Sequence, residues 1–210
     1  MLRSALVFLF CLLLAPCVYS QHLPQKKPRK ISCPEFWWAV KHVFIAGKAF
    51  CITKQSLAIT ADVMKSDTLD GDGQGGQVDA FRHSFWMAML AQKIDPRKAQ
   101  KLGIAHEKGN YKDFKRGRLE DGLPPDKISS AMDLFNNERG VQIGFDNPEL
   151  SIDSLKMRVV ESILKGEMRI MYKDKSGNYL QCNDSLINLR EFEGQWNIPK
   201  CLIPSGPRKK

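Results

Sequence analysis

The sequence lacks the short motifs that mark several large enzyme classes. It contains no G-x-S-x-G, no P-loop and no dinucleotide-binding glycine pattern, which argues against α/β-hydrolases, P-loop NTPases and Rossmann dehydrogenases. Glu107 follows a histidine, but Lys108, Gly109 and Asn110 come next, so the H-E-x-x-H motif of zinc hydrolases is absent. No C-x-x-C pair occurs, which argues against a structural zinc or a thioredoxin-type redox site.

Long apolar runs are equally scarce, and the one that exists lies at the N-terminus. The stretch from Leu6 to Ala15 is too short to span a bilayer, and Val18-Tyr19-Ser20 suits cleavage before Gln21. We therefore predict a signal peptide over residues 1–20 and an exported, periplasmic or secreted protein. A lipid anchor is not expected, because proline precedes Cys17. No later stretch approaches about 18 apolar residues, so the mature chain should hold no transmembrane segment.

Acidic residues are in the minority. The chain has 32 Lys and Arg against 23 Asp and Glu, a formal net charge of +9. Much of the excess lies in two terminal runs, Lys26–Lys30 and Pro207–Lys210. Such runs are usually solvated tails; contact with an anionic envelope component is the alternative, and no clear nucleic-acid motif is present. The pattern divides the chain into the signal peptide (1–20), a disordered basic leader (21–31), a helical domain (32–172) and a C-terminal extension (173–210).

Cysteine is sparse but even in number. Four of the six cysteines follow the predicted cleavage point, and an even count in an exported chain suggests disulfides. A Cys182–Cys201 bridge would close a short irregular loop, and we predict it. A straight helix from Cys33 to Cys51 would separate these two by about 27 Å, beyond the reach of a disulfide. Either the chain bends near Gly47, or the four cysteines pair otherwise, or Cys33 and Cys51 stay free.

Apolar residues at helical spacing dominate the rest of the sequence. Ser32, Asp95 and Ser151 are suited to begin helices, and proline follows at the first turn of two of them. The predicted helices cover 32–47, 49–65, 79–93, 95–109, 126–139 and 151–166, with Gly140 as the C′ residue of the fifth. Residues 168–172 and 179–182 are predicted to form a hairpin across 175–178. The predicted fold class is mainly α, a compact domain of about five to six helices with a small C-terminal β-hairpin.

One predicted helix carries polar residues where a core is expected. Asp79, Arg82, His83 and Trp86 stand at i, i+3, i+4 and i+7 and share one helix face. Apolar residues fill its other sides, which is typical of a central helix. Buried polar groups are costly unless they find partners, and Asp79 can accept a hydrogen bond from His83 one turn later. This face is therefore either a polar core or a functional site.

Two further helices place polar residues where they could meet His83. His106 shares a face with apolar residues, and Asp133 lies on a polar stripe with two asparagines. Imidazole and carboxylate groups can hold zinc or iron with open positions, or act as a general acid–base pair. A structural polar network is the alternative. The candidate catalytic residues are His83, His106, Glu107 and Asp133, the candidate metal ligands are His83, His106 and Asp133, and the candidate binding residues are Asp79, Arg82, Trp86, Asn136 and Asn137.

A loop rich in Gly and Asp precedes the central helix. Residues 68–79 place side-chain oxygens at positions 1, 3, 5 and 12 of an EF-type calcium loop, with Gly73 at position 6. The candidate calcium ligands are Asp70, Asp72 and Asp79. The match is partial, because threonine stands at position 1 and aspartate replaces glutamate at position 12. A flexible turn is the alternative, and calcium would compete with His83 for Asp79.

Three pieces of the sequence stand out together. They are Asp79-Ala80-Phe81-Arg82-His83 with Trp86, then Ala105-His106-Glu107, then Met132-Asp133-Leu134 with Asn136, Asn137, Gly140, Ile143 and Gly144. Together they resemble a bacterial domain family of unknown function found in exported and envelope-associated proteins. The resemblance covers residues 34–172 and leaves out the basic tails and the C-terminal cysteines. It implies that these positions form one constellation, and it implies no particular reaction.

These residues support two hypotheses about function. The first is an exported hydrolase acting on a phosphoester, lipid or cell-wall bond, with Arg82 as the anion contact. The second is a non-enzymatic envelope domain whose buried His/Asp/Asn network is structural. A functional site would need an opening to solvent at His83 and His106, whereas a structural network would be sealed.

Overall fold

A computed structural model describes residues 31–119 and 122–206 of the chain. The predicted signal peptide, leader residues 21–30 and the basic run 207–210 lie outside the described residues. The elements are α2 (Cys33–Lys41), α3 (Val43–Lys65), α4 (Gln77–Lys93), α5 (Pro96–Phe114), α6 (Lys127–Asp146), α7 (Ile152–Leu164), β1 (Arg169–Met171), the 3-10 helix η1 (Leu189–Phe192) and β2 (Leu202–Pro204). The mainly α fold with a small β element is confirmed. None of the described helices is long and apolar enough to cross a membrane.

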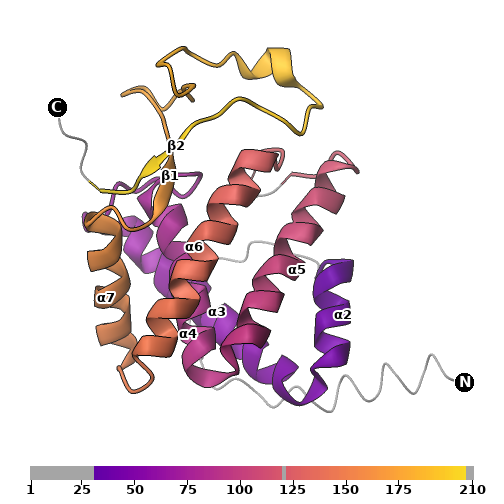
Figure 1. Cartoon of the computed structure of the whole chain (residues 1–210), viewed down its shortest axis with the longest axis vertical. Coiled ribbons are helices and arrows are strands. Elements are labelled where there is room, and N and C mark those ends of the chain that lie inside the picture. Colours follow the sequence, from indigo (N-terminus) through magenta and orange to yellow (C-terminus); the bar gives the residue numbers. More distant parts are fainter. Residues whose placement is uncertain (1–30, 120–121, 207–210) are drawn as a thin grey trace, which may run out of the picture.

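Helix α4 is the centre of the helical bundle. It contacts α3, α5, α6 and α7, and Figure 1 shows these helices side by side with the two strands at one end. Every residue from Val78 to Ala91 is buried except Arg82. Phe81 and Phe85 stack with ring centroids 4.9 Å apart. The prediction of a central helix that is apolar on nearly all sides is confirmed, and this burial forces its polar residues to find partners inside the protein.

Helix α6 approaches α4 more closely than side chains would allow. A Cβ atom on Gly140 would lie 2.1 Å from the carbonyl oxygen of Ser84, and one on Gly144 would lie 2.2 Å from that of Ala88. The predicted helix end at Gly140 is therefore wrong, and α6 continues to Asp146. These glycines allow the backbones of two packed helices to touch. In a sequence, a glycine with this role cannot be told from a glycine that ends a helix.

Two other predicted helix boundaries, the break in the first helical stretch and the end of α5, also differ in the structure. The first helical stretch breaks at His42 and not at Gly47, which lies inside α3. Trp38 donates a hydrogen bond to the carbonyl of Lys98, so α2 is anchored on α5 while α3 turns toward α4. Helix α5 continues past Gly109 to Phe114. A Cβ on Gly109 would lie 2.5 Å from the hydroxyl of Ser32, so this glycine lets the start of α2 pack on α5.

The β element joins distant parts of the chain. Strand β1 pairs antiparallel with β2, with Ile170 opposite Ile203. The strand beside 169–171 is therefore 202–204 and not the predicted 179–182, which pairs with the chain only beyond β1, where the Leu180 amide donates to the Tyr172 carbonyl. The predicted turn over 175–178 is closed by an isolated antiparallel β-bridge between Lys173 and Tyr179. The Ser205 hydroxyl fixes β2 beside β1, because it donates to the Ile163 carbonyl at the end of α7 and accepts from the Met168 amide.

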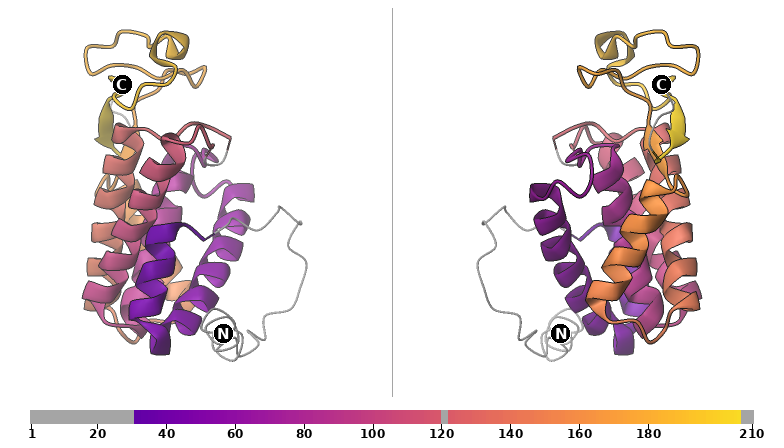
Figure 2. Two further views of the ribbon diagram at one scale, coloured as in Figure 1. Left: turned by 90° about the vertical axis from the view of Figure 1, so that its right-hand side faces the viewer. Right: turned by 90° about the vertical axis from the view of Figure 1, so that its left-hand side faces the viewer.

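The segment between the strands lies over one end of the bundle (Figures 1 and 2). The predicted Cys182–Cys201 disulfide is confirmed, with the two Cα atoms 5.0 Å apart. Cys33 is exposed and free, so it forms no bridge with Cys51. The disulfide fixes the residue before Cys201 in place, and that residue, Lys200, reaches the candidate site.

Candidate functional site

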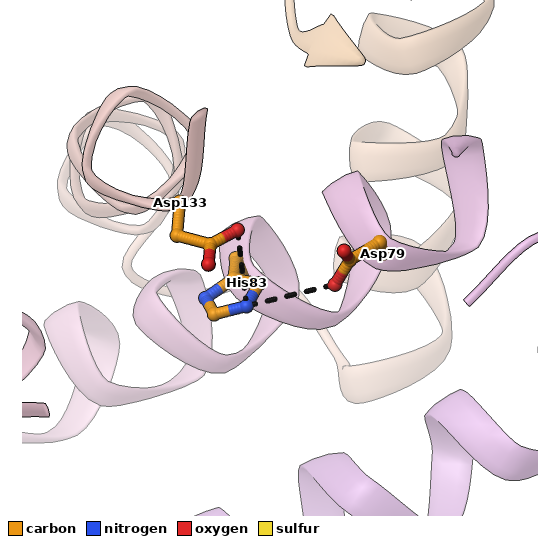
Figure 3. Close-up of side chains that lie close together, drawn as sticks. All are labelled: Asp79, His83 and Asp133. Carbon is orange, nitrogen blue, oxygen red and sulfur yellow. Dashed lines mark ion pairs between the residues drawn. The ribbon is translucent and has the colours of Figure 1, made fainter. Parts of the chain in front are cut away.

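His83 lies between two carboxylates that come from different helices. Its Nε2 atom is 3.6 Å from Oδ1 of Asp79, one turn earlier on α4, and 3.3 Å from Oδ1 of Asp133 on α6. Figure 3 shows both carboxylates directed at the same ring nitrogen. The exposed fractions are 2% for His83, 4% for Asp133 and 6% for Asp79. The close α4–α6 packing described above is what brings Asp133 to His83.

The spacing of these atoms fits a shared metal ion. Ligand atoms bound to one tetrahedral zinc at about 2.1 Å lie about 3.4 Å apart, close to both distances measured from His83 Nε2. Ligand atoms of Asp79, His83 and Asp133 all lie within 4.8 Å of one another. Within 31–119 and 122–206, no other set of three His, Cys, Asp or Glu side chains is arranged in this way. One nitrogen and two oxygens suit zinc, iron or manganese.

Asp79 is held in place by two further partners. Its Oδ1 accepts from Arg82 Nη2 at 2.6 Å and from Arg82 Nε at 3.1 Å, and its Oδ2 accepts from the Gly75 amide at 2.7 Å. This support fixes the carboxylate in the way that outer partners orient metal ligands. The Arg82 charge offsets one of the two carboxylate charges beside His83.

A small, partly open pocket reaches the carboxylates. It is lined by Asp79, Arg82 and Asp133 from the helices, by 73–74, by 123–125 and 129, and by Lys200 from the C-terminal extension. Arg82 therefore reaches the pocket, as an anion contact would require. Neither histidine lines it. The opening to solvent that a functional site was expected to have at His83 and His106 is not found at these histidines, which are buried. The pocket opens at Asp79 and Asp133 instead.

Lys200 is the charged residue of this pocket that could not be predicted from the sequence. Its Nζ atom lies 2.6 Å from Oδ2 of Asp126 and 4.0 Å from the centre of the Tyr179 ring. The Lys200 side chain is 7% exposed and that of Asp126 is 1% exposed. Asp126 also caps α6, the helix that carries Asp133. No spacing rule links residue 200 to residue 126, so only the fold could reveal this contact.

His106 has a partner that the sequence analysis also missed. Its Nδ1 atom lies 2.9 Å from Oε1 of Glu35 on α2. Its ring contacts those of Trp86 and His83, with centroids 5.4 and 6.1 Å away. The available signal was the Ser32-x-x-Glu35 spacing of a capping box, which the structure contains. His106 therefore lies beside the Asp79–His83–Asp133 cluster without belonging to it.

The Glu35–His106 pair should make stability depend on acid pH. Burial alone would raise the pKa of Glu35, but hydrogen bonds and charge from His106, with bonds from Ser32, hold it at about 2 against an ordinary 4.5. A depressed carboxyl pKa adds stability that is complete above about 4.5 and is lost as pH falls through about 2. We expect Glu35→Gln to remove this part of the pH dependence, at most about 3 kcal/mol. Urea unfolding between these pH values measures it, with exposed Asp153→Asn as control; equal slopes for both variants would contradict it.

The remaining predicted residues have identifiable contacts. Trp86 donates to the Thr53 hydroxyl at 2.8 Å. Glu107 accepts from the Asn110 amide at 3.2 Å, away from the pocket lining. Asn136 exchanges two 2.9 Å hydrogen bonds with the backbone of Arg169, so it ties β1 to α6. Asn137 is 3% exposed, and neither of its side-chain polar atoms has a hydrogen-bond partner among the residues that the structure describes. The structure thus gives Trp86 and Asn136 structural contacts.

The Asp-rich loop is arranged around backbone amides and a lysine. Asp70 accepts from the amides of 72, 77 and 78. Asp72 accepts from the Gln74 amide, and its other oxygen lies 2.5 Å from Lys173 Nζ. The Lys173 ammonium group therefore lies beside a carboxylate oxygen of Asp72, one of the candidate calcium ligands. The calcium site at Asp70, Asp72 and Asp79 stays a prediction, and the turn explains these contacts without it.

Comparison with known proteins identifies the domain. Residues 36–167 match a family described as a domain of unknown function, DUF6973. The chain belongs to this family. No curated protein and no solved structure matches it. The match to DUF6973 includes Asp79, His83 and Asp133, whereas Glu35 precedes it and Lys200 follows it. The central cluster is thus part of the DUF6973 domain, and one wall of the pocket comes from outside it.

Proposed function

We propose that this chain is an exported hydrolase that binds one divalent metal ion at Asp79, His83 and Asp133. Its substrate would be an anionic ester, with a phosphoester as the preferred class, bound in the adjoining pocket. The observation that carries the proposal is the convergence of two carboxylate oxygens on His83 Nε2 at 3.3 and 3.6 Å. Both carboxylates also line the pocket. The disulfide fits an oxidising compartment outside the cytosol.

Each group in the pocket has a place in such chemistry. A metal ion held there would lower the pKa of a bound water and polarise the ester. Arg82 would bind the anionic group of the substrate while it orients Asp79. Lys200 adds a second positive charge to the pocket wall, balanced in part by Asp126. His106, held by Glu35, would pack against the His83 ring and help to fix its orientation.

A metal titration tests the proposal. Chelated, purified protein is given zinc, manganese, magnesium or calcium, and metal content, melting temperature and hydrolysis of p-nitrophenyl phosphate, bis-p-nitrophenyl phosphate and p-nitrophenyl acetate are measured. We expect one zinc or manganese ion per chain. At a hundredfold excess over Kd the gain is about 2.7 kcal/mol, or about 5–10 °C in melting temperature.

Variants decide which residues bind the ion. His83→Ala and Asp133→Asn should lose both the ion and the temperature shift, while exposed Asp153→Asn on α7 should keep both. Wild-type protein that binds none of the four ions would overturn the metal site. Hydrolysis by metal-free protein that His83→Ala abolishes would favour acid–base catalysis at the same cluster.

A structural role for the network is the second candidate. It is favoured by the burial of both histidines, which are 2% and 8% exposed and do not line the pocket. In that case His83→Ala would lower stability, and no ion or ester would bind. The titration above separates the two functions, because a purely structural network gives no metal-dependent shift in the wild type.

A further inference from the structure

Helix α3 carries a stripe of exposed apolar side chains that none of the described helices and strands covers. Phe50, Leu57 and Met64 follow one another at intervals of seven residues and are 40%, 51% and 45% exposed. Seven residues are close to two helical turns, so these side chains share one side of the helix. Phe44, near the start of α3, is 96% exposed. At about 100° per residue, Phe44 lies about 120° around the helix from Phe50, so it is not on the same side. We call Phe50, Leu57 and Met64 the α3 stripe.

The position of α3 in the fold explains why the stripe is uncovered. Helix α3 packs mainly against α4, with a smaller contact to α2, and Figure 2 shows it at the edge of the bundle. Its inward side consists of Ala49, Ile52, Ser56, Thr60 and Val63, all buried. Large apolar side chains gathered on one exposed face usually mark an interaction site.

The charges beside the stripe are mainly positive. Lys54 and Lys65 are exposed within about 60° of Phe50 around the helix, and Asp62, the acidic residue of α3, lies 3.9 Å from Lys65. Lys54 extends over the Phe50 ring with its Nζ atom 4.8 Å from the ring centre, so cationic and aromatic groups form one surface. An apolar face bordered by lysines is the composition of helices that lie in the interface of an anionic bilayer.

We propose that the α3 stripe binds the surface of an anionic lipid bilayer, with its apolar side chains between the headgroups and its lysines on the lipid phosphates. A second copy of the chain fits less well, because a twofold contact through this face would bring two sets of lysines together. An acidic polymer would leave the apolar side chains without a partner. Membrane contact here would be peripheral and independent of the pocket at Asp133.

Vesicle sedimentation tests the inference with the purified full chain. We expect binding to vesicles rich in phosphatidylglycerol and little binding to pure phosphatidylcholine, with release in about 1 M salt. Phe50→Ser with Leu57→Ser should weaken binding at least about tenfold, because two inserted side chains are lost. Lys54→Gln and Lys65→Gln should each weaken it about fivefold.

Matched controls remove equally exposed apolar groups from other helices. Phe145→Ser on α6 and Met157→Ser on α7 replace side chains that are 61% and 58% exposed, and they should leave vesicle binding unchanged. Circular dichroism of all variants checks that they fold. The inference is overturned if wild type binds neither vesicle, if the controls weaken binding as much as the stripe variants do, or if only removal of 207–210 abolishes binding. A dimer that only the stripe variants dissociate would assign the face to a second copy instead.

Discussion

Replacement of Gly140 by alanine should destabilise the protein by about 3 kcal/mol or more. In an unconstrained helix this change would stabilise by about 0.5–1 kcal/mol, because glycine has the greater backbone entropy to lose. Here the new methyl group would lie 2.1 Å from the Ser84 carbonyl oxygen, a backbone atom of a buried helix that cannot rotate away. Helices α4 and α6 would have to separate, at the cost of overpacking a core. Urea unfolding of the variant and the wild type measures the difference.

Other glycines provide a graded comparison. Gly144→Ala should behave like Gly140→Ala, since its Cβ would lie 2.2 Å from the Ala88 carbonyl oxygen. Gly103→Ala should cost much less, because the nearest atom is the side-chain nitrogen of Asn137 at 3.0 Å, which can shift. Gly140→Ala with wild-type stability would show that the two helices are not in backbone contact. It would also remove the reason for Asp133 to lie beside His83.

Replacement of Asp79 by alanine should cost about 3 kcal/mol even without metal. The change removes the carboxylate that accepts two hydrogen bonds from the Arg82 guanidinium, and it leaves the Gly75 amide unbonded. A buried cation or donor that loses its partner is destabilising by more than the net value of the bond. The Arg82 side chain is 22% exposed, so it can recover part of the loss by turning to water.

A double-mutant cycle measures the interaction free energy between Asp79 and Arg82. Asp79→Ala with Arg82→Met removes both charges, and it should be less destabilised than the sum of the single variants. Asp79→Asn keeps an acceptor for the Gly75 amide and should be intermediate. Single variants whose effects simply add would show that Asp79 and Arg82 do not interact, and the carboxylate would then lack its fixed orientation toward His83.

Helical spacing located most of the site in the sequence. The i, i+4 relation of Asp79 and His83, and the polar stripe that contains Asp133, follow from the period of an α-helix. The apolar residues on the other sides of α4 indicated a buried position, which the structure confirms. Capping residues likewise fixed the starts of α2, α5 and α7 at Ser32, Asp95 and Ser151.

Contacts between distant segments could not be predicted in this way. Glu35 and His106 are 71 residues apart, and Lys200 and Asp126 are 74 residues apart, so no local period relates them. Glycine was misleading for a physical reason: at Gly109 and Gly140 it permits close packing, whereas in the sequence it resembles a helix end. The exposed stripe on α3 was invisible because the same apolar spacing describes a buried face.

Anomalous diffraction from crystals of the full chain soaked with zinc can locate the proposed metal ion between Asp79, His83 and Asp133. We expect one strong peak at the zinc edge, about 2.0–2.2 Å from His83 Nε2 and from one oxygen each of Asp79 and Asp133. The peak should vanish in Asp133→Asn crystals and leave the fold unchanged. A wild-type crystal with no peak between these three side chains, or with zinc bound only at His106 and Glu35, would rule out the metal site at His83.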